Sequence, residues 1–340
     1  MTASIKDVAR VAGVSPATVS RALGNGPVSA KLRAQVEAAV RDTGYRPNLS
    51  ARRLRSQHSQ TVGLIVADIS NPFFTAVSRA VEDAAYQAGL RVILCNTDEN
   101  PEKEALYLKL MEEERVTGVI FAPTRLTADR LAKQRVNFPI VLIDRATASG
   151  YQDAVVLDNH AASAMLVEHL YAEGYRRITG LFGNASTTGI ERHNGYVSAM
   201  QRYALTPEAK FVAPIVEAAE TEVGQWLARG TVPEAVIASN GLLLMGVVRA
   251  LRAAGKTTPD DLAIAGFDNE TWTELIGPGL TVIEQPVTAI GRTAMALLLE
   301  RLDAPGAPIR KVVLGGRCVI RGSTAKRKLA VMAGKLSEIL

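Results

Sequence analysis

Residues 15–21 carry side chains suited to reading the edges of DNA base pairs. Arg21 can bind a guanine through two parallel hydrogen bonds, and the small Ala17 would let a helix come close to the bases. Hydroxyl groups on the same stretch could donate hydrogen bonds to phosphates. The candidate DNA-binding residues of this region are Ser15, Pro16, Ala17, Thr18, Ser20, Arg21 and Asn25.

Two short helices joined by a tight turn are expected to position these side chains. Ser4 and Asp7 have the spacing of a capping box for the first helix. Gly13 supplies the turn, and Ser15 with Pro16 after it can begin the second helix. The apolar residues that this arrangement would bury are Ile5, Val8, Ala9, Ala12, Val19 and Leu23. The pattern predicts a helix-turn-helix, and the alternative is an ordinary helical corner that contacts nothing.

The distribution of charge favours the DNA-binding interpretation. Residues 1–60 contain ten Lys and Arg against three Asp and Glu, a net charge of +7. Because the whole chain has a net charge of +5, the remainder carries −2. A basic head on a slightly acidic body is typical of nucleic-acid binding. A third helix over residues 29–43 is expected to complete the head.

A second basic stretch follows the head at residues 49–56. It is shorter than the roughly 12–15 residues that an isolated helix needs in water, so we expect it to be helical only where DNA and a second copy support it. Leu54 lies among arginines and suggests an apolar wedge inserted into a minor-groove base step, with Ala51 and Arg55 as neighbouring DNA contacts. The alternative is a solvated linker whose leucine packs locally.

Short apolar runs alternate with amphipathic helices in the rest of the chain, whereas residues 204–234 show a less regular pattern. We expect strands at residues 61–67, 91–96, 118–122, 139–144, 153–157, 178–182, 235–239 and 262–267, and helices at 73–88, 102–114, 159–173, 191–203 and 241–254. Strands buried between helices predict an α/β fold with doubly wound parallel sheets, here in two similar lobes. A length of 340 residues also fits more than one domain.

Polar side chains follow nearly every one of these strands. In parallel α/β sheets a ligand binds beyond the carboxyl ends of the strands, so these positions predict a binding site. They are Asp68, Thr124, Asp144, Arg145, Asp158, Asn159, Asn184, Asn240 and Asp268.

The sequence argues against an enzyme. Gly255-Lys256-Thr257 resembles the end of a phosphate-binding loop, but Ala250 stands where that loop requires glycine. No G-x-G-x-x-G follows the first strand, and no G-x-S-x-G elbow occurs. The four histidines lack the spacing of metal ligands. We therefore expect no catalytic residues, no cofactor and no metal.

Nothing in the sequence points to a membrane or an oxidising compartment. The first 25 residues contain no apolar run of signal-peptide length, and no stretch approaches the roughly 18 apolar residues of a membrane span. Cys95 and Cys318 lie in strand-like surroundings that favour reduced thiols. These observations predict a cytoplasmic protein without a membrane partner.

An ordered set of motifs covers residues 4–323. These motifs are DVARVAGVSPATVSRAL, YRPNLSARRLR, VGLIVADISNPFF, VLIDR, LDN, ERHNGY, GFDN and TVIEQP. On these motifs the chain resembles the lactose/galactose repressor family. The resemblance implies a dimeric repressor whose head binds a pseudo-palindromic operator, whose hinge helix inserts Leu54 at the operator centre, and whose core resembles periplasmic binding proteins and binds a small-molecule effector between its lobes.

The resemblance also implies a division of the chain. The head would span residues 1–46, the hinge 47–59, the core 60–325 and a basic tail 326–340. Within the core, the first lobe would comprise residues 60–158 and 286–313, and the second 159–285 and 314–325. Apolar residues spaced by three and four in the tail could form a tetramerising coiled coil, and the alternative is a disordered or locally packed tail.

By position, the resemblance implies that the effector touches residues of both lobes. They are Phe73, Phe74, Thr124 and Arg145 in the first lobe, Arg192, Asn240 and Asp268 in the second, and Gln285 at the crossover. The family commonly has aspartate after the residue at position 240, where this chain has Gly241, so a helix cap or ligand contact is expected to be missing there.

The chemistry of these residue types suits a sugar acid. The two phenylalanines can stack on a sugar, and the Arg145 fork matches a carboxylate. Each also has a structural alternative: the phenylalanines could be core, Arg145 could pair with Asp144 or Asp158, and Asp268 could cap a helix.

Among members of the family the chain looks most like regulators of ketogluconate use, which implies 2-ketogluconate as the effector that relieves operator binding. A neutral sugar or a purine is the alternative effector. A sugar-binding transport receptor would share the lobes but would leave the basic head unexplained.

Overall fold

The computed structural model describes residues 3–23, 27–45, 59–131, 136–146 and 150–325. The chain divides into two compact units, residues 1–59 and 60–340, which we call the head and the core. Among the described residues, no helix is both long and apolar enough to cross a lipid bilayer.

The described residues of the head form three helices, as the sequence predicts: α1 (Ile5–Val11), α2 (Pro16–Ala22) and α3 (Ala30–Thr43). The Asp7 carboxylate accepts a hydrogen bond of 2.9 Å from the Ser4 backbone N–H, and the Ser15 hydroxyl caps α2 by accepting from the Thr18 N–H at 3.1 Å. Gly13 has a φ of +62°, which a glycine adopts without strain. The apolar centre of the head consists of Val8, Ala9, Ala12, Val19, Ala22, Val36 and Ala39.

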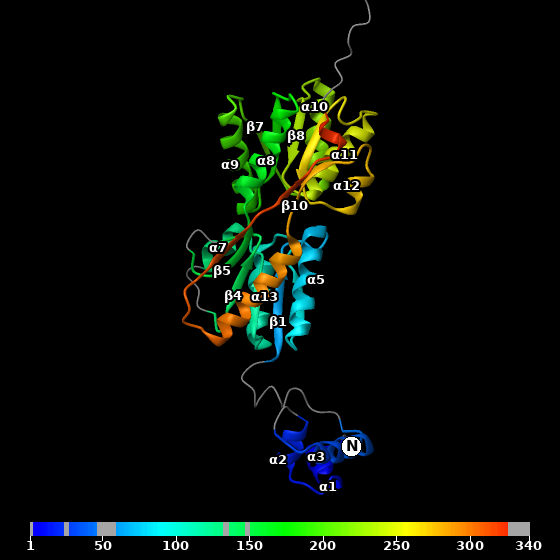
Figure 1. The fold of residues 1–340 in the computed structure, drawn as a ribbon, viewed down its shortest axis with the longest axis vertical. Helices are drawn as coiled ribbons and strands as arrows, with labels where there is room; N and C mark the ends of the chain where they lie inside the picture. Colours follow the sequence, from blue (N-terminus) through cyan, green and yellow to red (C-terminus); the bar gives the residue numbers. More distant parts are fainter. Residues whose placement is uncertain (1–2, 24–26, 46–58, 132–135, 147–149, 326–340) are drawn as a thin grey trace, which may run out of the picture. The chain divides into compact units, whose positions relative to one another are not determined.

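Two six-stranded sheets with the same strand order form the core (Figure 1). The first sheet has the order β11-β5-β4-β3-β1-β2 and is parallel throughout, and the second has the order β12-β10-β9-β8-β6-β7, in which only β12 is antiparallel to its neighbour. The strands of the first sheet are β1 (Thr61–Val66), β2 (Arg91–Asn96), β3 (Gly118–Phe121), β4 (Ile140–Ile143), β5 (Asp153–Leu157) and β11 (Lys311–Leu314). Those of the second are β6 (Ile178–Gly183), β7 (Glu208–Val212), β8 (Ala235–Ala238), β9 (Ala263–Phe267), β10 (Thr281–Glu284) and β12 (Arg317–Val319). We call the two sheets with their helices lobe 1 and lobe 2.

Helices cover both faces of each sheet, which explains why most strands are buried throughout. In lobe 1, α5 and α13 pack on one face and α6 with α7 on the other; in lobe 2, α8 and α9 oppose α10 and α11. The helices are α5 (Pro72–Gln87), α6 (Pro101–Glu113), α7 (Arg125–Leu131), α8 (Asn159–Ala172), α9 (Thr187–Arg202), α10 (Val216–Arg229), α11 (Gly241–Ala253), α12 (Thr271–Leu275) and α13 (Val287–Asp303), and a 3-10 turn, η1 (Gly322–Thr324), follows β12. The α/β class with two doubly wound, mostly parallel sheets is therefore confirmed.

Two elements lie where the sequence pattern is irregular. Residues 204–234 contain the edge strand β7 and the helix α10. Most of β7 is exposed or half-buried, so it lacks the apolar run of a central strand. Helix α10 buries Ala219, Val223 and Trp226 at helical spacing, a signal that was present in the sequence.

The chain passes between the lobes three times. It leaves lobe 1 after β5 to form α8, returns after β10 to form α13, and crosses again between β11 and β12. The last crossing is visible as the long orange-red segment that runs across both lobes in Figure 1.

Glycines let the paired helices on one face of each lobe come close together. A Cβ atom added to Gly195 of α9 would lie 2.3 Å from the His160 carbonyl oxygen of α8, and one added to Gly291 of α13 would lie 2.6 Å from the Ala80 Cβ of α5. Both distances are shorter than real Cβ contacts, so only glycine fits at these crossings.

Candidate functional site

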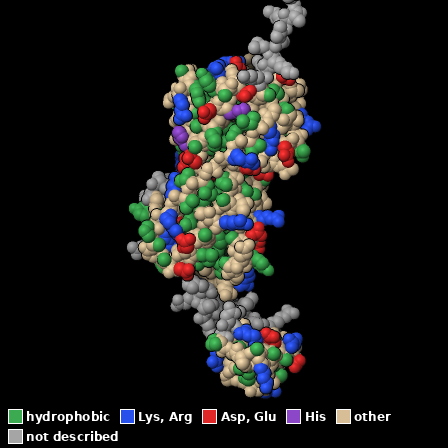
Figure 2. Space-filling view, viewed as in Figure 1, with side chains coloured by type: hydrophobic (Ala, Val, Ile, Leu, Met, Phe, Trp, Pro, Cys, Tyr) green, Lys and Arg blue, Asp and Glu red, His purple; other side chains and the backbone are tan. Residues whose placement is uncertain are grey.

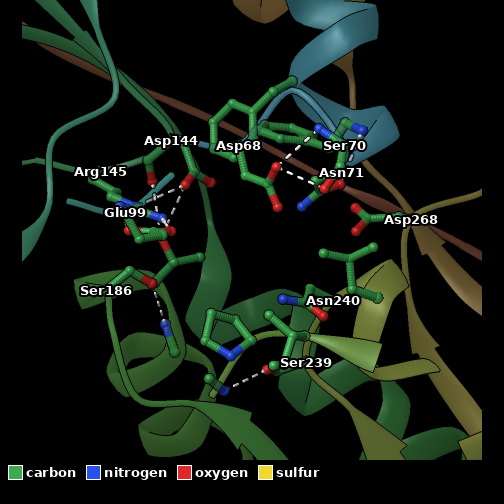
Figure 3. A pocket seen from close by; sticks show the side chains of 18 of the residues that line it. Asp68, Ser70, Asn71, Glu99, Asp144, Arg145, Ser186, Ser239, Asn240 and Asp268 are labelled. Atoms are coloured by element: carbon green, nitrogen blue, oxygen red, sulfur yellow. Dashed lines mark hydrogen bonds and ion pairs between the residues drawn. The ribbon is translucent and has the colours of Figure 1, made fainter. Parts of the chain in front are cut away.

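A cavity of about 340 Å³ lies where the carboxyl ends of the two sheets face each other (Figure 3). This volume is within the roughly 300–1,000 Å³ typical of small-molecule sites. Seven of the eight residues expected at the effector site line it: Phe73, Phe74, Arg145, Arg192, Asn240, Asp268 and Gln285. Both lobes and the second crossover therefore contribute to one site.

Thr124 is the expected residue that does not line the cavity. Its backbone N–H and its hydroxyl both donate to the carboxylate of Glu104, at 2.6 and 2.7 Å. Both groups are buried, so Thr124 ties the end of β3 to α6. This role is structural.

The two phenylalanines form an apolar wall at the start of α5. Their rings meet edge to face, with centroids 5.0 Å apart, and both side chains are buried. Asn71 caps this helix by accepting from the Phe73 N–H at 3.1 Å, which fixes the first turn of α5 at the cavity. The wall gives a ligand an apolar surface on which to pack.

Arg145 is held by the protein's own acidic groups. Its guanidinium makes a bidentate contact with Glu99, which includes a 2.8 Å bond from Nη1, and donates to Asp144 at 3.2 Å and to the Pro123 carbonyl at 2.9 Å. Burial opposes the charged form, but the neighbouring carboxylates of Glu99, Asp144 and Glu104 together outweigh it and raise the pKa of the guanidinium. The expected alternative partner Asp144 is present, whereas Glu99, which lies 46 residues from Arg145, was not foreseen.

Arg192, in contrast, retains an unused donor. Its Nε donates to the Asn159 side chain at 2.8 Å and its Nη1 to the Ser239 carbonyl, while its guanidinium carbon lies 4.0 Å from the centroid of the Phe267 ring. Among the described residues, its buried Nη2 has no hydrogen-bond partner. Burial lowers the pKa of this guanidinium.

Gln285 presents the complementary unused group. Its Nε2 donates to Asp268 at 2.6 Å, but its Oε1 is buried without a partner. A buried polar atom without a hydrogen bond is costly, so the two free atoms on Arg192 and Gln285 mark where a ligand would gain most.

Asp268 and Asp144 occupy equivalent places in the two lobes. Each directly follows the fourth strand of its sheet, and each has a positive φ, +75° and +64° respectively. Non-glycine residues in this region of φ are uncommon and collect at functional sites. Burial raises the pKa of the Asp144 carboxyl despite the nearby arginines.

Asn240 caps α11 despite the glycine that follows it. Its Oδ1 accepts from the Leu243 N–H at 2.8 Å, so the expectation of a missing cap is corrected. The Gly241 N–H donates to Asp268 Oδ2 at 2.8 Å, and a Cβ at Gly241 would lie 3.3 Å from that oxygen. Asp268 thus links the N-terminus of α11 to Gln285.

Several cavity residues were not among the expected effector contacts. Asp68 and Asp144 are two of them, although both were expected near a binding site as residues that follow strands. The others include Asn71, Asp98, Glu99, Ser186, Thr188 and Ser239. Glu99 follows β2 by three residues, so the rule that ligands lie beyond strand ends could have found it. Thr188 connects the lobes, since its hydroxyl donates to the carbonyl and to Oδ2 of Asp144, both at 3.3 Å.

The cavity contains more carboxylates than cations. Five acidic side chains line it against two arginines. The acidic residues are Asp68, Asp98, Glu99, Asp144 and Asp268. Asp98 is paired with Lys103, and Asp68 accepts hydrogen bonds from Ser70.

In the head, α2 displays the side chains expected to bind DNA. Ser15, Pro16, Ala17 and Arg21 are exposed, and Thr18 and Ser20 are half-buried. Figure 2 shows basic side chains, coloured blue, on the visible face of the head. Asn25, Ala51, Leu54 and Arg55 lie outside the described residues.

Comparisons with known proteins agree with this two-part site. Residues 4–48 match the family model for bacterial regulatory proteins of the lacI family, and residues 167–324 match the model for a periplasmic binding protein-like domain. The chain is 31% identical to the HTH-type transcriptional regulator DegA of Bacillus subtilis, with 96% of this chain and 99% of that protein covered.

Other relatives carry different names at similar identity. The HTH-type transcriptional regulator PtxS of Pseudomonas plecoglossicida is 33% identical, with 95% of this chain and 96% of that protein covered. The HTH-type transcriptional repressor PurR of Photobacterium profundum is 31% identical, with 94% and 98% covered. A crystal structure of the lac repressor dimer bound to operator and an anti-inducer superposes with a TM-score of 0.87 at 25% identity, covering 96% of this chain and all of that chain.

The chain therefore belongs to the LacI family of transcriptional regulators. It is a DNA-binding repressor with a ligand-binding core, and it is not an enzyme.

Proposed function

We propose that this repressor releases its operator when a small, hydroxyl-rich sugar binds in the cavity between lobes 1 and 2. The observation that carries this proposal is the pair of unused buried atoms, the donor Nη2 of Arg192 and the acceptor Oε1 of Gln285. Hydroxyl groups of a ligand can accept from the first or donate to the second, and the Phe73–Phe74 wall can pack against an apolar sugar face.

Two classes of effector are consistent with the relatives. A sugar acid, with 2-ketogluconate as the specific candidate, is supported by the resemblance to regulators of ketogluconate use and by the two arginines in the cavity. A neutral sugar is supported by the bidentate contact of Arg145 with Glu99 and by the excess of carboxylates. The geometry favours the neutral sugar, because Arg145 has no free fork to offer a carboxylate. Because one relative is named PurR, a purine is a third class of effector that a binding screen could identify.

Operator binding is proposed to require a homodimer that reads a pseudo-palindromic site in the cytoplasm. Helix α2 would contact base edges through Arg21 and Ala17, and the hinge would insert Leu54 between base pairs. A ligand that prefers one closure of the lobes would change the separation of the two hinges in the dimer, and DNA affinity would fall by the difference in ligand affinity between the two states.

The substitution Arg192→Gln tests this proposal. A panel of neutral sugars, sugar acids and purines is first titrated calorimetrically into the wild type, and each hit is tested for release of DNA selected by the protein from a random pool. Because a hydrogen bond to a charged group contributes about 1.5–3 kcal/mol, Arg192→Gln is expected to weaken binding of the hit roughly 10- to 150-fold. DNA binding without ligand should be retained.

The matched control is Arg202→Gln, an exposed arginine at the end of the same helix, α9. It should behave like the wild type in both measurements. A hit that binds Arg192→Gln as tightly as the wild type would place the effector elsewhere.

A further inference from the structure

We propose that Glu99 is a specificity-determining residue: it acts as a built-in carboxylate that occupies Arg145 and makes the cavity accept neutral sugars and reject acidic ones. This inference rests on the proposed function, because it names the ligand class of the same cavity. The residue type of Glu99 alone does not reveal this role in ligand selectivity.

The contact between the two side chains is complete. Arg145 makes four hydrogen bonds, two to the Glu99 carboxylate and one each to Asp144 and Pro123. The Arg145 side chain is 5% exposed and that of Glu99 is 20% exposed, so little water competes with the pair. A ligand carboxylate would need the same two hydrogen bonds from Arg145 that Glu99 accepts, so it would have to displace Glu99.

The backbone holds Glu99 in place. Asp98 and Glu99 have φ values of +51° and +55°, a left-handed conformation that non-glycine residues rarely adopt twice in succession. The Glu99 N–H donates to the Ala67 carbonyl at 3.0 Å, and the Asn100 N–H donates to the Thr97 carbonyl at 3.0 Å. Such strained conformations persist only when surrounding contacts over-determine them, and here they direct Glu99 to Arg145.

The rest of the cavity reinforces the exclusion of anions. Asp268 and Asp144 lie beside the same ligand volume, so an anion that failed to displace Glu99 would face several carboxylates. A neutral hydroxyl carries no such penalty, and a hydroxyl can accept from Arg192 or donate to Gln285, which both line the cavity. Selectivity thus arises from repulsion of the wrong ligand as well as from contacts to the right one.

The first test compares matched pairs of neutral and acidic sugars. Fructose and 2-ketogluconate differ only in a hydroxymethyl group in place of a carboxylate, and glucose with glucuronate and galactose with galacturonate extend the series. The wild type is expected to bind the neutral member of a pair and not the acid. In Glu99→Ala the ratio of acid to neutral affinity should rise roughly tenfold or more, because the Arg145 fork becomes free. Glu102→Ala, an exposed glutamate on α6, is the control for the change in charge.

The second test needs no sugar. In Glu99→Ala, added acetate should take the place of the missing carboxylate and raise the melting temperature by several degrees relative to the same concentration of chloride. The wild type, Glu102→Ala and the double variant Glu99→Ala/Arg145→Met should show no such rise, since none of them has a free Arg145. Should Glu99→Ala not fold, Glu99→Gln gives the ratio of acid to neutral affinity.

The outcomes separate the inference from the proposed function. A wild type that prefers the acid, or a folded Glu99 variant with an unchanged ratio and no acetate effect, overturns the role of Glu99 while leaving the sugar effector intact. A wild type that binds DNA but no sugar overturns the proposed effector and with it the selectivity, whereas acetate rescue would still show that Glu99 occupies Arg145.

Discussion

Arg145 and Arg192 are both arginines that line the cavity and are similarly buried, yet they differ in what they can bind. Arg145 has partners for four donor contacts, and Arg192 has a free Nη2. The difference comes from Glu99 and Asn159, which lie far from the two arginines in sequence. The arginine residue type thus predicts that a side chain could bind a ligand. The residues around it decide whether its N–H donors remain available to do so.

Asp153, which lies away from the cavity, allows a prediction about the stability that a buried ion pair contributes. Its carboxylate is 1% exposed, binds Arg301 through hydrogen bonds of 2.8 to 3.0 Å and accepts from the Arg310 N–H at 2.8 Å. Asp153→Asn leaves the Arg301 charge buried without its partner, so the free energy of unfolding should fall by about 3–5 kcal/mol. Urea denaturation of the core measures this loss.

An exposed ion pair in the same region provides the contrast. Arg310 and Glu300 are 41% and 59% exposed, so water solvates both charges in either state. Glu300→Gln should leave the urea midpoint almost unchanged. Equal effects of Asp153→Asn and Glu300→Gln would mean that burial does not set the strength of these pairs.

At the scale of elements, the sequence predicts most strands well because they are buried on both faces. Strand β5, which is buried throughout, has the expected bounds, and so does β2, an edge strand whose residues are largely apolar. Helix α11 differs from expectation by one residue at its end, and α5 by one residue at each end. Strand β7 was missed because its residues, EAKFV, form no apolar run, whereas those of the other edge strand, β2, do. Helix α9 begins earlier than expected because Ser186 caps it by accepting from the Gly189 N–H. Local pattern thus identifies elements with an apolar run and fails where that run is missing or a cap decides the outcome.

In the candidate site, too, residues with a local sequence signal were predicted and contacts distant in sequence were not. Seven of eight expected residues line the cavity, because strand ends and the family resemblance both locate them. Thr124 does not line the cavity and instead bonds to Glu104 on α6, 20 residues away, a contact that has no local signal in the sequence. The pairing of Arg145 with Glu99 is invisible for the same reason.

The helix crossings at Gly195 and Gly291 yield a prediction about packing. An alanine at either position would place its Cβ within 2.3 or 2.6 Å of the facing helix, so the helices must separate. Gly195→Ala and Gly291→Ala should each lower the free energy of unfolding by roughly 1–3 kcal/mol. Thermal and urea denaturation measure the change.

Gly224 is the matched control, because it lies within α10 and a Cβ there meets nothing within 4 Å. Gly224→Ala should stabilise the core by up to about 1 kcal/mol, since alanine favours the helix. Destabilisation by all three substitutions would show that close approach is not the reason for these glycines.

At the scale of the whole core, the hydroxyl of Thr188 in lobe 2 donates to Asp144 in lobe 1 and so favours one closure of the lobes. Thr188→Val keeps the shape of the side chain but removes a hydrogen bond of about 0.5–1.5 kcal/mol, so effector affinity should fall roughly two- to tenfold. By linkage, a shift in closure must also change operator affinity. Calorimetry and operator titration measure the two effects.

The neighbouring Thr187 provides the control, because its buried hydroxyl has no hydrogen-bond partner. Thr187→Val should leave both affinities unchanged. If Thr188→Val also changes neither, the contact between the lobes does not contribute to the switch.

The three crossings also constrain how the core is made on the ribosome. Strand β11 pairs with β5, but 153 residues lie between Leu157 and Lys311, and all of lobe 2 up to β10 is synthesised in between. At roughly 5–20 residues per second, the edge of β5 waits about 8–30 seconds for its partner. An unpaired strand edge invites association with other chains, so the nascent protein should be most open to capture by chaperones in that interval. Lobe 1 begins first yet is finished only after most of lobe 2 has been synthesised.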